Sequence, residues 1–237
     1  AVGDAVFWMG YDRFYIYDGR VQVIPCSVRD HVFQDFNETQ SDKVYAGVNS
    51  AFGEVFWFYP SQTNAVANGG SGENDKYVVY NYDQKIWYVG SLARSSWIDR
   101  GVYQYPMATD SNLVYNHEKG NDNDGTAFTS FIESSPIDVQ DGDQFIFLRR
   151  MIPDISFENS DSNISNDNKQ AVLSLKAQRS PNGGFVKTST NTVTSTTELN
   201  HLRLRGRSFG LRVESTTQGV NWRLGTQRVD LRADGDR

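Results

Sequence analysis

The chain has 237 residues, of which 38% are hydrophobic and 22% charged, a composition typical of a globular protein with one large all-β domain or two smaller domains. No apolar run approaches 18 residues, so we predict no membrane span, and the single cysteine, Cys26, excludes an internal disulfide and a paired-cysteine zinc site. The net charge of −6 argues against a uniformly basic protein that grips phosphates.

Aromatic and β-branched residues predict strands through most of the first 90 residues. The expected strands are residues 5–10, 13–18, 20–25, 54–60, 76–83 and 85–90. The pair Asp18-Gly19 predicts a hairpin turn. Residues 29–38 alone have a helical pattern, with Val32, Phe33 and Phe36 directed inward.

Two stretches of the chain share one spacing. Each carries two tyrosines and an aspartate, and an arginine follows that aspartate after eleven residues: Asp18 to Arg29, and Asp83 to Arg94. The two aspartates are 65 residues apart, and removing the 16-residue polar loop 61–76 leaves a period of 49, the size of a β-propeller blade. A partial third copy covers residues 105–120, with Asp110-Ser111-Asn112 as its turn. The alternative is that two hairpins of a β-sandwich share a spacing by chance.

The pattern changes after residue 131. Leucines at 202 and 204 alternate with arginines at 203 and 205, which predicts strands with one buried face. We predict a polar loop at 158–169 and an extended edge or long loop at 188–198. The expected fold is therefore all-β, with β-propeller-like blades in residues 1–131 and an antiparallel β-sandwich-like terminal domain in residues 132–237.

Charge divides unevenly between these two parts. Residues 1–131 hold 9 basic and 16 acidic side chains, net −7, and residues 132–237 hold 14 and 13, net +1. Residues 199–228 contain one acidic residue, Glu214, and six arginines: Arg203, Arg205, Arg207, Arg212, Arg223 and Arg228. These arginines are either the solvent face of several strands, paired with carboxylates of a neighbouring chain or blade, or a cationic strip for DNA or an acidic partner. Because the only aromatics in this stretch are Phe209 and Trp222, which we expect in the core, we favour the first interpretation.

The sequence contains no recognisable catalytic or cofactor motif. Its three histidines are 86 and 84 residues apart, and neither a nucleophile elbow nor a lysine-containing phosphate loop is present. In residues 117–125, Asp122 and Asp124 fit a calcium loop, but the first ligand would be Gly120 and the final acid Phe131. We therefore predict no catalytic residue, no metal, no cofactor and no enzymatic activity.

Five stretches carry a resemblance to a known family. They are "VFWMGYDRFYIYDG", "YAGVNSAFGEVFWFYPS", "YVVYNYDQKIWYVGSLARSSWIDRG", "YNHEKGNDNDG" and "WRLGTQRVDLRADGDR". In this order they resemble the tail nozzle, or packaged-DNA stabilisation, proteins of short-tailed bacteriophages. The similarity runs along nearly the whole chain and rests on no catalytic motif. Members of that family are typically longer, so we expect this chain to be part of a longer one.

The resemblance implies a virion structural protein of the phage tail. Such proteins form a homo-hexameric ring below the portal and adaptor, and the ring retains and conducts DNA without binding it specifically. In a closed ring each subunit uses two different faces, so an acidic patch should meet a basic one. We expect Arg203, Arg205, Arg207 and Arg212 to lie at such a subunit interface.

Two other functions stay open at this stage. The polar loops 61–76 and 158–169 would suit a host-receptor or carbohydrate-binding module of a virion. The abundant aspartates would suit a propeller glycosidase, although the sequence identifies no carboxylate pair.

Overall fold

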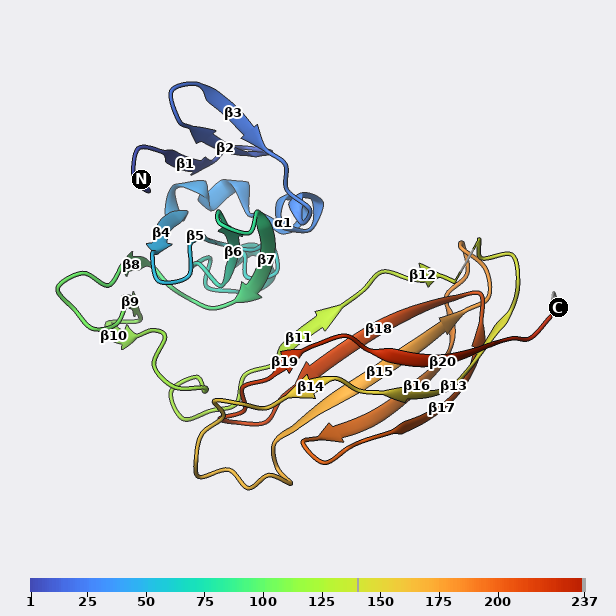
Figure 1. Ribbon diagram of the computed structural model, residues 1–237. Helices are drawn as coiled ribbons and strands as arrows, with labels where there is room; N and C mark the ends of the chain where they lie inside the picture. Colours follow the sequence, from blue (N-terminus) through green and yellow to red (C-terminus); the bar gives the residue numbers. More distant parts are fainter. Residues whose placement is uncertain (140, 236–237) are drawn as a thin grey trace. The chain divides into compact units, whose positions relative to one another are not determined.

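The computed structural model describes residues 1–139 and 141–235 and divides into two compact units, unit 1 (Ala1–Lys119) and unit 2 (Gly120–Arg237) (Figure 1). This division precedes the expected boundary at residue 131. The reason is that β11 (Ser130–Glu133) pairs with β18 (Ser208–Ser215) and so belongs to unit 2. Strands hold 47% of the residues and helices 7%, in several antiparallel sheets, which confirms the all-β prediction. None of the described helices is long and apolar enough to cross a membrane.

Unit 1 contains three antiparallel sheets, each a meander in chain order. The first consists of β1 (Val6–Met9), β2 (Phe14–Tyr17) and β3 (Val21–Ile24). The second consists of β4 (Tyr45–Asn49), β5 (Glu54–Tyr59), β6 (Lys76–Asn81) and β7 (Ile86–Ser91). The third consists of β8 (Ser96–Ile98), β9 (Met107–Asp110) and β10 (Leu113–Asn116). The helices are α1 (Arg29–Asp35), at the predicted place, and the 3-10 helices η1 (Glu38–Lys43) and η2 (Val66–Asn68).

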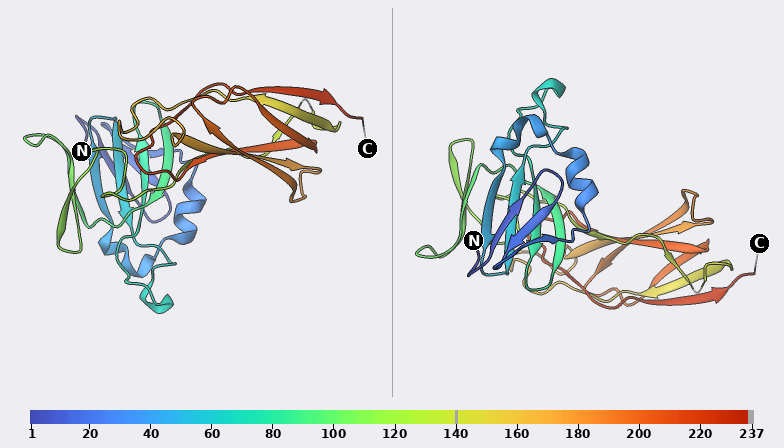
Figure 2. Two further views of the ribbon diagram at one scale, coloured as in Figure 1. Left: turned by 90° about the horizontal axis from the view of Figure 1, so that it is seen from below. Right: turned by 90° about the horizontal axis from the view of Figure 1, so that it is seen from above.

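The second sheet of unit 1 is buried on both faces. On one face, Trp57 packs on Phe14 of the first sheet, with ring centroids 5.0 Å apart. On the other face, Phe56 stacks on Trp97 of the third sheet at the same separation. The β1–β3 and β8–β10 sheets therefore cover opposite faces of β4–β7, as Figures 1 and 2 show. Double burial explains why residues 55–59 form a continuous apolar run instead of an alternating one.

The sequence repeat corresponds to strand order and not to side-chain environment. Asp18 and Asp83 both lie in the turn between the last two strands of a meander, β2–β3 in the first case and β6–β7 in the second, but that turn has three residues in the first case and four in the second. Arg29 is exposed in α1 and pairs with acidic neighbours. Arg94 is only 6% exposed and donates a hydrogen bond to a histidine ring. The third copy is a hairpin, β9–β10.

The three sheets form an open stack, and the described residues contain no closed propeller. The predicted propeller architecture is therefore not confirmed. Closure of a propeller requires further sheets around a common axis, and three sheets of three or four strands do not supply them.

The first sheet also has an apolar face directed away from the core. Strand alternation buries Phe7, Met9, Phe14 and Ile16 in the core of unit 1. The opposite side, which we call the β1–β3 outer face, carries Val6, Trp8, Tyr15, Tyr17, Val21 and Val23. Four of these six are between 44% and 63% exposed. The sheet is thus apolar on both faces although only one face is covered.

Unit 2 contains two larger antiparallel sheets. One has the order β11, β18, β15 (Gln170–Gln178), β16 (Phe185–Thr194), with β12 (Ile137–Asp138) also paired to β18. The other has the order β17 (Asn200–Gly206), β13 (Ile146–Ile152), β20 (Arg228–Ala233). A short pair joins β14 (Ile155–Ser156) and β19 (Arg223–Leu224). The two large sheets face each other over one core that includes Leu148, Leu204, Leu173 and Val213 (Figure 2).

Candidate functional site: a basic pocket between two edge strands

A bulge in β17 shapes the site. Leu148 of β13 lies opposite Leu204, and Arg150 lies opposite His201, so β17 has one residue more than β13 in this interval. Arg203 is in the bulge and has a φ of 61°. A left-handed backbone is uncommon for a residue other than glycine, and bulges of this kind redirect a side chain out of the regular pleat.

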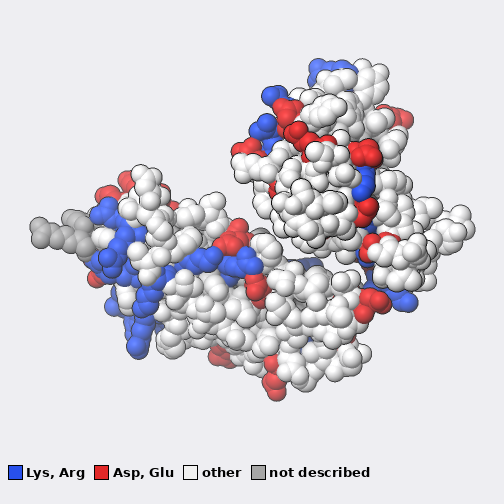
Figure 3. All heavy atoms as spheres, turned by 180° about the vertical axis from the view of Figure 1, so that it is seen from behind, with Lys and Arg blue, Asp and Glu red and all other residues white. Residues whose placement is uncertain are grey.

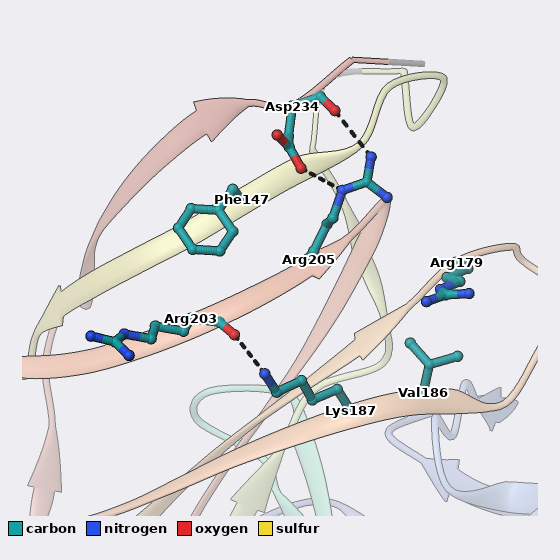
Figure 4. Close-up of a pocket in the computed structure, with 7 residues that line it drawn as sticks. All are labelled: Phe147, Arg179, Val186, Lys187, Arg203, Arg205 and Asp234. Atoms are coloured by element: carbon teal, nitrogen blue, oxygen red, sulfur yellow. Dashed lines mark hydrogen bonds and ion pairs between the residues drawn. The ribbon is translucent and has the colours of Figure 1, made fainter. Parts of the chain in front are cut away.

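A pocket of about 510 Å³ opens beside this bulge, between β16 and β17 (Figure 4). Both strands are sheet edges: β16 ends one large sheet and β17 ends the other. The pocket is lined by four basic side chains, Arg179, Lys187, Arg203 and Arg205. Its other lining residues are Asp234, Phe147 and Val186. The described part of its lining therefore carries four positive charges and one negative charge.

Arg205 is held in place on two sides. Its guanidinium forms an ion pair with the Asp234 carboxylate and also donates to the Asp234 backbone carbonyl at 3.1 Å. The same guanidinium lies over the ring of Phe145, 4.0 Å from the centroid. Phe145 also lies beneath Arg207, at 4.9 Å. Stacked and paired guanidinium groups of this kind have little freedom to reorient.

The opposite wall of the pocket comes from the β15–β16 hairpin. Lys187 of β16 donates to the backbone carbonyl of Arg203 at 3.0 Å, which ties the two edge strands together (Figure 4). Arg179 is the first residue of the hairpin loop. The loop is fixed by the neighbouring Gln178, whose side chain is 7% exposed and donates to the carbonyls of Pro181 and Gly183.

The four predicted interface arginines occupy three different places. Arg203 and Arg205 line the pocket, and Arg207 lies beside it over Phe145. Arg212 lies on β18 of the other sheet and is not a pocket residue. Its guanidinium pairs with Glu133 at 2.8 Å and also with Glu214. Arginines of this stretch thus pair with carboxylates of their own unit.

Glu133 is the centre of that second cluster. Hydrogen bonds from Lys176 and then from Arg212 hold the pKa of its carboxyl below the ordinary value. The Arg212 guanidinium also lies 4.0 Å from the centroid of the Phe131 ring. The charges of this cluster are thus paired with one another within β11, β15 and β18.

Sequence reasoning missed Arg179, Lys187 and Asp234. Arg179 precedes a Ser-Pro-Asn-Gly-Gly turn and Lys187 opens the Thr-rich stretch, so each looked like an isolated surface charge. Figure 3 shows Lys and Arg side chains gathered at one end of unit 2. Arg179, Lys187 and Asp234 come together only because the edge strands β16 and β17 lie side by side.

No group of three or more potential metal ligands occurs among the described residues. In the acidic segment considered above for calcium, Asp122 accepts the backbone N–H of Gly125 at 3.1 Å and closes a turn. Gln218 donates to the other oxygen of the same carboxylate at 3.3 Å.

The sequence matches no protein-family model and no curated protein.

Proposed function

We propose that this chain is a structural subunit of a phage tail, a nozzle or hub protein that forms a closed ring and conducts the packaged DNA. The resemblance of five aromatic-rich stretches to tail nozzle proteins suggests this function. The observation that carries it is the β1–β3 outer face, because a face of this kind is typical of a subunit that is completed by assembly.

The β1–β3 outer face has no charged side chain among its six residues. Sheets that face water usually alternate apolar with polar side chains, whereas sheets covered on both sides do not. Contiguous apolar patches of this kind on soluble proteins mark interaction surfaces. In the proposed assembly another sheet covers this face and continues the stack, so that unit 1 contributes blades to a propeller-like architecture.

The opposite end of the stack supports a head-to-tail contact. The side of the β8–β10 sheet that faces away from the core of unit 1 carries Ser96, Ile98, Met107, Thr109, Val114 and Asn116. This side is also uncharged, and Val114 is 67% exposed. Two different uncharged faces at the two ends of one stack suit a heterologous interface, which generates a ring when the rotation closes.

The electrostatic part of the proposal concerns Arg203 and Arg205. Residues 1–119 hold 9 basic and 14 acidic side chains, net −5, while the pocket of unit 2 is locally positive. Acidic unit 1 surfaces of one subunit would therefore attract the basic end of unit 2 of the next. An acidic unit 1 would also let DNA slide without phosphate contacts.

The test is assembly of a double variant, Val21→Glu with Val23→Glu. Both side chains lie on the outer face, at 63% and 47% exposure, so the variant should fold while its buried interface would contain two carboxylates. We expect rings in negative-stain images and native mass spectra of the unmodified chain, and monomers of the variant. Val66→Glu is the matched control, because Val66 is 66% exposed and lies in η2, away from the outer face.

Two outcomes would contradict the proposal. Rings that persist in the double variant would remove the outer face from the interface. A chain that stays monomeric and binds immobilised glycans would favour the receptor-binding alternative instead.

A further inference from the structure

We propose that the basic pocket of unit 2 binds a phosphate group, held by Arg179, Lys187 and Arg203. The group would belong either to a small phosphorylated molecule or to the backbone of a nucleic acid. This goes beyond the proposed function, in which the basic end of unit 2 attracts an acidic surface of the next subunit and DNA passes without a defined contact.

The charge balance of the pocket favours a dianion. Asp234 is the only carboxylate among the described residues that line the pocket, and Arg205 engages it through both its side chain and its backbone carbonyl. Three further cations remain. No described residue accepts a hydrogen bond from the guanidinium of Arg179 or of Arg203, so their donors are available. One carboxylate needs a single arginine, whereas a phosphate with three acceptor oxygens can engage all three cations.

The pocket is built before any ligand enters. Gln178 fixes the loop that carries Arg179, and the Oγ of Ser208 in turn donates to the Gln178 side chain at 3.1 Å. The backbone N–H of Arg207 donates to the Gln178 carbonyl at 2.8 Å, which joins this loop to the end of β17. Contacts of this kind reduce the ordering that binding would otherwise require.

The left-handed backbone at Arg203 supports a functional role for this residue. Glycine adopts such a φ without strain, while arginine adopts it only where the surrounding structure imposes it. An arginine at a position that suits glycine indicates that the side chain itself contributes something. In Figure 4 the Arg203 side chain extends along β17 beneath Phe147, and its guanidinium points away from Lys187 and Arg179.

The alternative interpretation is that these cations protect sheet edges. Lysine and arginine on an edge strand discourage pairing with another chain, and β16 and β17 are both edges. Edge protection requires only scattered charges directed into solvent. It does not explain why cations from a loop and from two strands of different sheets line one hollow of about 510 Å³.

The experiment uses the full chain and two phosphate probes. Inorganic triphosphate is titrated calorimetrically, and a fluorescein-labelled 12-nucleotide single strand is followed by anisotropy. The variants are Arg203→Gly, which suits the left-handed backbone, and Arg179→Gln. Arg223→Gln is the matched control, since it removes an exposed arginine of the same unit outside the pocket.

We expect Arg203→Gly and Arg179→Gln each to weaken triphosphate binding about tenfold, with Arg223→Gln unchanged. Arg203→Gly should retain or raise the melting temperature, which separates loss of binding from loss of fold. If the source is a nucleic acid, the oligonucleotide should bind more tightly than triphosphate. The slope of the logarithm of the binding constant against the logarithm of the salt concentration should then become shallower by about one unit for each cation removed.

Three outcomes would overturn the proposal. The first is no measurable binding of either probe. The second is an equal loss of triphosphate affinity in the pocket variants and in Arg223→Gln. The third is that a glutamate hexapeptide binds more tightly than triphosphate and is lost with Arg203→Gly. That result would assign the pocket to an acidic protein segment. Ring assembly is measured separately, so failure here leaves the proposed function standing.

Discussion

The pair formed by Arg94 and His117 shows how one buried residue sets the chemistry of its neighbour. The Arg94 Nε donates to the His117 Nε2 at 2.9 Å, so this nitrogen must be unprotonated. Arg94 also lies over the Tyr115 ring, 4.4 Å from its centroid, and its carbonyl accepts from Asn74 at 3.1 Å. Burial, and then the positive charge of Arg94, lower the His117 pKa from 6.5 to about 4.

This pair predicts a stability loss on mild acidification. A lowered pKa means that the folded state favours the neutral form of His117. The contribution of this preference to the free energy of unfolding is complete above pH 6.5 and is lost as the pH falls towards 4. We expect a loss on the order of 2 kcal/mol in the free energy of unfolding, allowing for partial solvent exposure. His117→Gln keeps an acceptor for Arg94 but does not titrate, so urea unfolding at pH 7 and pH 4 should show a smaller loss.

His31→Gln is the control, because His31 is exposed on α1. Its pH dependence should match that of the unmodified chain. Identical pH profiles for His117→Gln and the unmodified chain would refute this account of the pair.

At the scale of elements, close approach between β4 and β8 depends on one glycine. A Cβ on Gly47 would lie 2.5 Å from ring atoms of Trp97. Trp97 is 7% exposed, and its indole N–H donates to the Val48 carbonyl at 2.8 Å. The ring thus packs on Gly47 and Phe56, which are neighbours on one face of the second sheet, and this contact holds the third sheet on the second.

Gly47→Ala should therefore lower the free energy of unfolding by about 1–3 kcal/mol, the usual cost of overpacking a filled core. The measurement is chemical denaturation followed by tryptophan fluorescence. Gly101→Ala is the control, because a Cβ there meets no atom within 4 Å, and its effect should stay within about 0.5 kcal/mol. Equal effects of the two substitutions would show that the Trp97 contact does not limit the packing.

At the scale of the whole molecule, the two units have separate cores. The core of unit 2 groups 14 buried residues, including Leu173, Leu204 and Val213, and none of them belongs to unit 1. Unit 1 has two core clusters, one on each face of its second sheet. A chain with independent cores should unfold in more than one step.

We expect residues 120–237, expressed alone, to fold and to unfold cooperatively. Calorimetry of the intact chain should then show two transitions, one of which coincides with that of the fragment. A fragment without a cooperative transition would contradict the independence of the two cores.

Much of the fold could be predicted because it follows from local patterns. Alternation identified the strands around Leu202 and Leu204, and a short apolar periodicity identified α1. The turn at Ser111-Asn112 was also expected, and both residues have the positive φ that a tight hairpin requires. Strand β4 was missed, because Tyr45–Asn49 has no strong alternation and its burial depends on its neighbours.

The sequence by itself determined an all-β chain of antiparallel hairpins, an acidic first half and a short stretch rich in arginine. Only the tertiary structure decided that Arg212 is neutralised by Glu133 and Glu214 while Arg203 lines a pocket with Arg179 and Lys187. The physical reason is that hydrophobic periodicity is a property of neighbouring residues along one strand. Charge pairing and pocket formation depend instead on which strands become edges and which edges meet.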